Sequence, residues 1–214
     1  MLRWETLGSE RKAFLSRLLS SMPIPGSYLA GGTALALILG HRESLDFDWF
    51  SPEEFDPDVL IRRLSQLGKI VVSDVQRGTF HGLLDGVRLT WLYYPNPLLD
   101  DFIQAEEMPG LKLASLLDIG LMKWTAVSQR GARKDFIDLY MICHKQYSLD
   151  TMAELFPKKY PGVDVNLYHM IKSLSYFDDA EREPMPRMLI HLPWPVVKSY
   201  FLNEQKKLLQ KYAG

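Results

Sequence analysis

The chain has 214 residues, 47% hydrophobic and 24% charged, which is ordinary for a globular protein and excludes disordered and collagen-like classes. A formal net charge of −1 excludes a strong overall basic field, so any contact with nucleic acid must be local. Cys143 is the only cysteine, which excludes a disulfide framework and a cysteine-rich zinc site, and no apolar run reaches membrane-spanning length. We therefore expect a cytoplasmic protein without a membrane segment.

The first hundred residues carry the signals of a mixed α/β core. Apolar residues at helical intervals predict a helix over 4–21, and a short apolar run predicts a strand over 28–30. A glycine pair then leads into a helix over 33–39, and the next apolar run predicts a strand over 45–50. Further along we expect a helix over 57–67 and strands over 70–75, 79–84 and 87–94.

The second half of the chain reads as helical. One helix should end at Arg130, just before Gly131, and another should cover 133–145, where a polar and an apolar face alternate. Proline breaks divide the helical pattern after residue 150, and a last helix opens at Trp194. The sequence therefore predicts an α+β protein with a mixed β-sheet. We expect a core domain over 1–100 and a helical C-terminal domain over 101–214, packed on the core.

Two aspartates stand two residues apart in the strand expected over 45–50. Residues i and i+2 of a strand share a face, so Asp46 and Asp48 should project together while Leu45, Phe47 and Trp49 pack the other way. Paired carboxylates suit a hard divalent cation that also binds phosphate oxygens. The alternative is a pair of solvated carboxylates at a strand edge, but aspartate is disfavoured in strands and the two charges would repel each other.

A glycine pair precedes these aspartates at a strand-to-helix turn. Gly31 and Gly32 carry no side chains that would keep phosphate oxygens from the backbone N–H groups, and a helix beginning near Thr33 would aim its positive dipole end at them. Thr33 could touch phosphate or cap the helix, and the whole turn could be only a turn. Ser44 lies two residues before Asp46 and would share its face, unless it is a loop residue bonded to its own backbone.

A second group of charged residues lies downstream. Lys123 and Arg130 are seven residues apart and therefore share one helical face, where they could hold triphosphate oxygens or form only a solvated surface. Asp135 stands in the first turn of the next helix, where a carboxylate is favoured by the dipole even without a catalytic task.

Two stretches together resemble a known family. The run GGTALALILGHRESLDFDWFS over 31–51 is similar to the first motif of the AbiEii/AbiGii-type nucleotidyltransferases, which belong to the DNA polymerase beta-like superfamily and include toxins of toxin-antitoxin pairs. The run over 118–140, with its lysine, arginine and Lys-Asp-x-x-Asp segment, is similar to a later motif of that family. The resemblance covers roughly residues 25 to 145.

The resemblance implies a fold, an activity and partners. The implied fold is a polymerase beta-like nucleotidyltransferase core, and the implied reaction is Mg²⁺-dependent transfer of a nucleotidyl group from an NTP to a tRNA 3′ end, another RNA or a protein. A cognate antitoxin protein is an implied partner. The implied catalytic residues are Asp46, Asp48, Lys123 and Asp135, with Asp46 and Asp48 as metal ligands and Gly31, Gly32, Thr33, Ser44 and Arg130 as nucleotide-binding residues.

One departure from the superfamily pattern keeps other functions open. Such enzymes usually carry a third carboxylate on the strand beside the paired aspartates, and the strand expected over 87–94 contains none. Loss of a general base typically slows an enzyme by roughly 10²–10⁴-fold without necessarily silencing it. The alternative is a catalytically weak or inactive module of the same fold that binds a nucleotide or a protein, and a metal-dependent phosphohydrolase is a third hypothesis.

Overall fold

The computed structural model describes residues 1–212 and contains two compact units. Unit 1 comprises Met1–Asn96 and Asp101–Ser115, and unit 2 comprises Pro97–Asp100 and the chain from Leu116 onward. This division differs from the predicted boundary at residue 100, because the segment 101–115 carries two short strands that join the sheet of unit 1.

The described residues of unit 1 form a seven-stranded sheet in the order β3-β4-β5-β2-β1-β7-β6. Two neighbouring pairs, β2 with β5 and β1 with β7, run parallel, and the other neighbours run antiparallel. The predicted mixed sheet is therefore confirmed. The strands are β1 (Tyr28–Ala30), β2 (Phe47–Ser51), β3 (Ile70–Gln76), β4 (Thr79–Leu84), β5 (Val87–Tyr93), β6 (Ile103–Gln104) and β7 (Lys112–Leu113).

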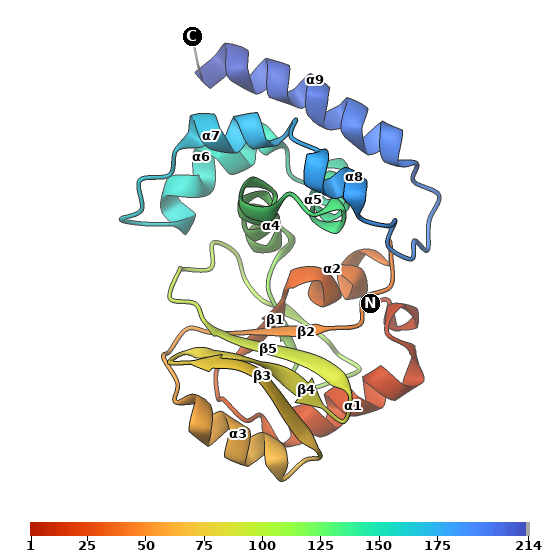
Figure 1. Ribbon diagram of the computed structural model, residues 1–214, viewed down its shortest axis with the longest axis vertical. Helices are drawn as coiled ribbons and strands as arrows, with labels where there is room; N and C mark the ends of the chain where they lie inside the picture. The colour runs from red at the N-terminus through yellow and green to blue at the C-terminus, as the bar shows by residue number, and fades with distance from the viewer. Residues whose placement is uncertain (213–214) are drawn as a thin grey trace. The chain divides into compact units, whose positions relative to one another are not determined.

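The helices of unit 1 flank this sheet, with α1 and α3 below the strands and α2 above them in Figure 1. Phe14 of α1 stacks on Phe47 of β2 with ring centroids 5.6 Å apart. Beside this contact Trp49 stacks on Trp91 of β5 at 5.2 Å, so aromatic rings fill the face that α1 covers. The elements are η1 (Trp4–Thr6), α1 (Gly8–Ser21), α2 (Gly31–Leu39) and α3 (Pro57–Ser65).

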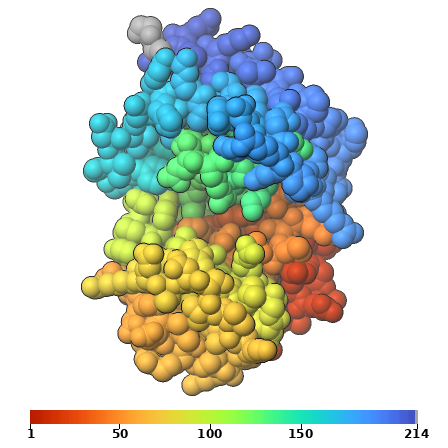
Figure 2. Space-filling model, in the orientation of Figure 1, coloured from red at the N-terminus to blue at the C-terminus, as the bar shows by residue number. Residues whose placement is uncertain are grey.

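Strand β3 forms one edge of the sheet, and its atoms, yellow in Figure 2, lie at the surface. The side chains of Val71, Val72 and Val75 are between 40% and 48% exposed. The register with β4 shifts between Val72 and Asp74, which indicates a β-bulge of the kind that disfavours edge-to-edge pairing with other chains. The shift leaves Asp74 directly opposite His81.

Unit 2 is helical and has its own aromatic core. The ring of Phe136 lies 5.0 Å from that of Phe177, 6.0 Å from Trp194 and 5.4 Å from Phe201. The predicted helical C-terminal part and the α+β class are therefore confirmed. None of the helices described over residues 1–212 combines the length and apolar character needed to cross a bilayer. The helices are α4 (Leu116–Arg130), α5 (Arg133–Lys145), α6 (Leu149–Lys159), α7 (Leu167–Ser173), α8 (Asp178–Arg182) and α9 (Trp194–Tyr212).

A buried ion pair anchors the segment 97–100 to these helices. Lys159 Nζ lies 2.7 Å from Asp118 Oδ1, and neither side chain is exposed. Lys159 also donates to the carbonyl oxygen of Pro97, and the backbone N–H groups of Leu99 and Asp100 donate to the Asp118 carboxylate. Burial lowers the pKa of Lys159, although the hydrogen bond and charge of Asp118 act against this shift.

Replacing Lys159 by methionine should lower the free energy of unfolding by about 3–5 kcal/mol, because the Asp118 carboxylate would remain buried without its cation. Denaturant unfolding followed by circular dichroism measures this loss. Lys158→Met is the matched control, since its neighbouring side chain is exposed and the change should cost less than about 0.5 kcal/mol. Equal effects of the two variants would contradict a structural role for the buried pair.

Candidate active site

The side chain of Asp48 lies over the turn that joins β1 to α2. Asp48 is half-buried, and it pairs with Ala30 of β1 and Thr90 of β5. A Cβ atom added to Gly31 would lie only 2.6 Å from Asp48 Oδ2, and Gly31 itself has a φ of +65°. Both the close approach and the left-handed backbone therefore require glycine at this position. The predicted strand alternation is confirmed for Phe47 and Trp49, which are fully buried.

Asp46 lies just before β2 rather than within it, because β2 begins at Phe47 and not at residue 45. The preceding loop is held by Thr33, whose hydroxyl is hydrogen-bonded to Ser44 Oγ at 2.8 Å and to the carbonyl oxygen of Asp46. Leu45 is 50% exposed, so the expectation that it packs with Phe47 is wrong. The loop turns Leu45 outward, and the buried Thr33 fixes the backbone that carries Asp46.

The second glycine makes room for a cation. Arg42 is only 4% exposed, and a Cβ atom added to Gly32 would lie 2.5 Å from Arg42 Nη2. Helix α2 begins at Gly31, two residues earlier than predicted, with no side-chain hydrogen bond from its N-cap residue Ala30. Backbone N–H groups of a first helical turn and a guanidinium group both bind anions well. The burial of Arg42 cannot be read from the sequence around it, and Gly32 is the residue whose lack of a side chain permits it.

The predicted site of unit 1 offers two carboxylates rather than three. Within residues 1–212, no group of three or more histidine, cysteine, aspartate or glutamate side chains is placed to hold a metal ion. Thr90 of β5 occupies the position beside Asp48 where a third carboxylate could stand. Mg²⁺ is commonly bound by one or two carboxylates together with water and substrate phosphates. The donor set of Asp46 and Asp48 therefore fits this cation.

The predicted residues of unit 2 form a separate ionic cluster between α4 and α5. Lys123 Nζ lies 2.8 Å from Asp135 Oδ1 and 2.6 Å from Asp138 Oδ2. Arg130 binds Asp135 through two hydrogen bonds, from Nε at 2.7 Å and from Nη2 at 3.0 Å. Two cations thus face two carboxylates. The side chain of Lys123 is 7% exposed, whereas that of Arg130 is 58% exposed, so Arg130 is the more accessible of the two cations.

Opposing effects act on the pKa of Asp135. Burial disfavours the charged carboxylate, but the charges and hydrogen bonds of Lys123 and Arg130 outweigh burial and lower the pKa of Asp135 below its ordinary value. Asp135 is therefore ionised at neutral pH and orients both cations. The contact of Asp138 with Lys123 cannot be read from the sequence spacing alone.

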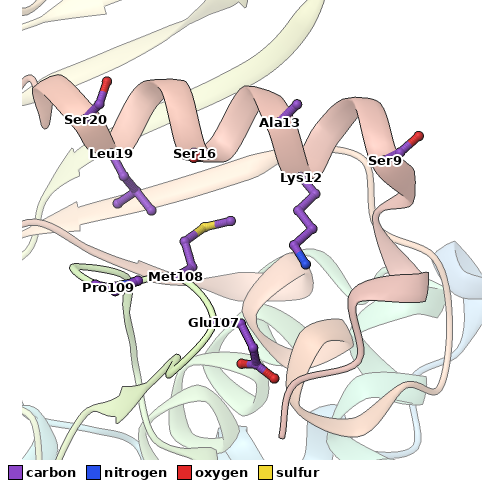
Figure 3. Close-up of a pocket in the computed structure, with 9 residues that line it drawn as sticks. All are labelled: Ser9, Lys12, Ala13, Ser16, Leu19, Ser20, Glu107, Met108 and Pro109. Carbon is purple, nitrogen blue, oxygen red and sulfur yellow. The ribbon is translucent and has the colours of Figure 1, made fainter.

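One pocket includes a residue of the predicted site, and another does not. Arg130 lines a pocket of unit 2 together with His169, Lys172 and Tyr176. Its lining carries more cationic than anionic side chains, which suits an anionic ligand. A pocket of unit 1 lies between α1 and the loop around Met108, where Leu19 and Met108 point toward each other (Figure 3). No residue of the predicted site is among those that line this second pocket.

The sheet, the glycine turn and the paired aspartates together define the class: the chain has a nucleotidyltransferase fold. It is similar to a putative nucleotidyltransferase from H. pylori, with a TM-score of 0.58, 14% identity and 94% of each chain covered. It is also similar to MenT4, a nucleotidyltransferase toxin from Mycobacterium tuberculosis H37Rv, with a TM-score of 0.51, 13% identity, and 91% of this chain and 82% of MenT4 covered. The predicted nucleotidyltransferase fold is therefore confirmed.

A curated relative gives the family. The uncharacterized protein aq_aa25 of Aquifex aeolicus (strain VF5) is 34% identical over 207 residues, which cover 95% of this chain and 98% of the relative. The chain belongs to the same family as aq_aa25. Models of known protein families give no match.

Gly31→Ala should destabilise unit 1, because the new methyl group strains the backbone and would lie only 2.6 Å from Asp48 Oδ2. We expect a loss in unfolding free energy of about 1–3 kcal/mol. Gly26→Ala is the matched control, since Gly26 also has a positive φ but meets nothing within 4 Å. Denaturant unfolding should show a larger loss for Gly31→Ala than for Gly26→Ala, and equal losses would contradict the interpretation.

Asp135→Asn should lower the free energy of unfolding by about 3–5 kcal/mol at neutral pH, because it leaves Lys123 buried with one partner fewer. The pKa of Asp135 is lower in the folded state than in the unfolded state. Its ionic contribution to the free energy of unfolding is therefore complete above the unfolded-state pKa of about 3.9 and is lost as pH falls through the folded-state pKa. The difference from wild type should therefore shrink on acidification below about pH 4. Denaturant unfolding at several pH values measures it.

The control for Asp135→Asn is Glu54→Gln. This change removes the partner of Arg77 in an ion pair whose side chains are 83% (Arg77) and 41% (Glu54) exposed. It should cost less than about 1 kcal/mol. A loss from Asp135→Asn as small as that of the control would show that the cluster is not a buried ion pair in solution.

Proposed function

We propose that the protein is a Mg²⁺-dependent nucleotidyltransferase that transfers a nucleotidyl group from an NTP to an acceptor. The observation that carries this proposal is the position of Asp48, whose carboxylate lies against Gly31 at the first turn of α2. A carboxylate for the metal and backbone donors for phosphate therefore meet within one turn of the chain. The confirmed fold supports the same reaction class.

In this proposal the residues of unit 1 hold the nucleotide. Asp46 and Asp48 would hold Mg²⁺, which when bound neutralises phosphate charge and lowers the pKa of a bound hydroxyl group. The backbone of Gly31 and Gly32 would donate hydrogen bonds to the triphosphate at the positive end of α2. Thr33 and Ser44 would keep the Asp46 loop in place through their mutual hydrogen bond.

The residues of unit 2 would supply further charge. Arg130 is proposed to bind phosphate oxygens, because its guanidinium group is both oriented by Asp135 and exposed. Lys123 is proposed to stabilise the charge that develops during transfer, and its contacts with Asp135 and Asp138 would hold it in position. These roles follow the resemblance of the segment 118–140 to the later motif of the family.

The biological setting is proposed on the same resemblance. MenT4 is a nucleotidyltransferase toxin, and we propose that this protein is likewise the toxin of a toxin-antitoxin pair. Its acceptor would be a tRNA 3′ end, another RNA or a protein, and a cognate antitoxin would be its protein partner. Such a protein would act in the cytoplasm.

A second candidate function is a nucleotide- or protein-binding module that transfers nothing. The observation that favours it is Thr90, which stands beside Asp48 in place of a carboxylate. Calorimetry separates the two candidates, because Mg²⁺-dependent NTP binding without turnover supports the module and any turnover eliminates it.

Asp46→Asn and Asp48→Asn should each reduce transfer from α-labelled NTPs to total tRNA by at least roughly 10²-fold, because a metal contributes several kcal/mol to the transition state. Gel separation of labelled RNA measures the product. Asp58→Asn is the control: this carboxylate is exposed at the start of α3 and its loss should leave the rate unchanged. Equal rates for wild type and both site variants would refute the proposed metal site.

A further inference from the structure

Four side chains form one row across the sheet of unit 1. Asp48 of β2 is in register with Thr90 of β5, Thr90 is in register with His81 of β4, and His81 is in register with Asp74 of β3. Paired residues of neighbouring strands project from the same face of a sheet. The row therefore lies on the face of Asp48, opposite the face where Trp49 stacks on Trp91.

Burial along the strands agrees with this assignment. In β4 the residues Phe80, Gly82 and Leu84 are buried, whereas His81 alternates with them and is half-buried. In β5 Leu89 and Trp91 are buried, whereas Thr90 between them is half-buried. The imidazole and the hydroxyl group are thus accessible from one side, as a proton acceptor that works on a substrate must be.

A hydrogen bond joins the two central members of the row. His81 Nδ1 lies 3.3 Å from Thr90 Oγ1, within hydrogen-bond distance. If Thr90 donates to Nδ1, its oxygen lone pairs are directed away from His81, and Asp48 is the next residue of the row on that side. Neighbouring strands are about 4.8 Å apart, so a hydroxyl group bound next to Asp48 would be a near neighbour of Thr90.

The geometry points to His81, acting through Thr90, as the acceptor of the proton released by the attacking hydroxyl group of the acceptor molecule. This inference rests on the proposed nucleotidyl transfer and names the group that takes the place of a third carboxylate. His81 is a positioning residue for Thr90 before the reaction and the final proton acceptor during it. Histidine is the side chain best suited to accept a proton near neutral pH.

The proposed step balances in atoms and charge. The acceptor oxygen forms a bond to the α-phosphorus of the NTP while the bond from that phosphorus to the bridging oxygen breaks. Pyrophosphate leaves with the electron pair of the broken bond. The proton of the attacking hydroxyl passes to Thr90 Oγ1 as the Thr90 proton passes to His81 Nδ1.

The charged groups of this face are favourable to the resulting imidazolium ion. Asp74 faces His81 from β3 and Asp48 lies beyond Thr90 on β2, so both carboxylates would attract its charge. Arg88 shares the Thr90 face of β5 and is exposed, so its opposing effect is screened by water.

The test begins with His81→Gln, which keeps a hydrogen-bonding side chain but removes the proton acceptor. Transfer from α-labelled NTPs to total tRNA should fall by roughly 10²–10⁴-fold, while Mg²⁺-dependent NTP binding by calorimetry stays unchanged. The wild-type rate should decline at acid pH, because a protonated imidazole accepts nothing, and His81→Gln should lack this decline. Thr79→Val is the control on the same face of β4 and should behave as wild type.

A rescue variant separates this role from a structural one. Thr90→Asp places a carboxylate beside Asp48. The double variant with His81→Gln should therefore transfer at least tenfold faster than His81→Gln alone. Nitrogen NMR of the wild type should show the neutral His81 tautomer protonated on Nε2, and Thr90→Val should perturb it. Transfer by His81→Gln at the wild-type rate would overturn this inference alone. Absence of transfer by the wild type, with Asp48→Asn equally silent, would overturn the proposed function and this inference together.

Discussion

The contact between the Asp48 carboxylate and the backbone of Gly31 is the constraint on which the site of unit 1 depends. The carboxylate occupies the space that any larger residue would fill, and the positive φ of Gly31 turns the chain from β1 directly into α2. Because β1 and β2 are paired at Ala30 and Asp48, the sheet register itself brings the acidic side chain to the helix start. Strand pairing, turn and helix thus all contribute to the contact between Asp48 and Gly31.

Gly32 leaves room for a cation in the way that Gly31 leaves room for the Asp48 carboxylate. The cation is the buried guanidinium group of Arg42, so the Asp48 carboxylate and this guanidinium group lie against successive glycines of one turn. In unit 2 the charges are combined differently, because Lys123 and Arg130 share the carboxylate of Asp135 and neutralise it. A buried charge cluster of this kind is stable only when its members are paired and well hydrogen-bonded, which explains why α4 and α5 both contribute to it.

Much of the fold could be predicted from periodicity and turn chemistry. Asp56 caps α3 and Pro57 opens it, and the Asp85-Gly86 pair joins β4 to β5, because such local signals act within a few residues. Strands β6 and β7 have only two residues each, which is too short for any alternation to show. Their existence depends on pairing with β1 and with each other, a long-range property that local patterns do not contain.

The candidate site was predictable in its residue types but not in its contacts. The spacing of Asp46 and Asp48 indicated a shared face, yet Thr33 holds the first of them in a loop through a partner thirteen residues away. The position of Thr90 beside Asp48 depends on strand order, because β5 lies beside β2 in the sheet although β3 and β4 lie between them in the sequence. Strand order is therefore the information that the linear pattern lacked.

The path of the chain between the two units has a consequence for fragments of this protein. The backbone passes from unit 1 to unit 2 at residue 97, returns at residue 101 and leaves again after residue 115. A polypeptide truncated at residue 100 would lack β7 and would leave the edge of β1 open to intermolecular pairing. It would also carry residues 97–100 without the lysine and aspartate that secure them. The two units are thus interleaved in sequence, and a fragment that contains all of unit 1 must extend to residue 115.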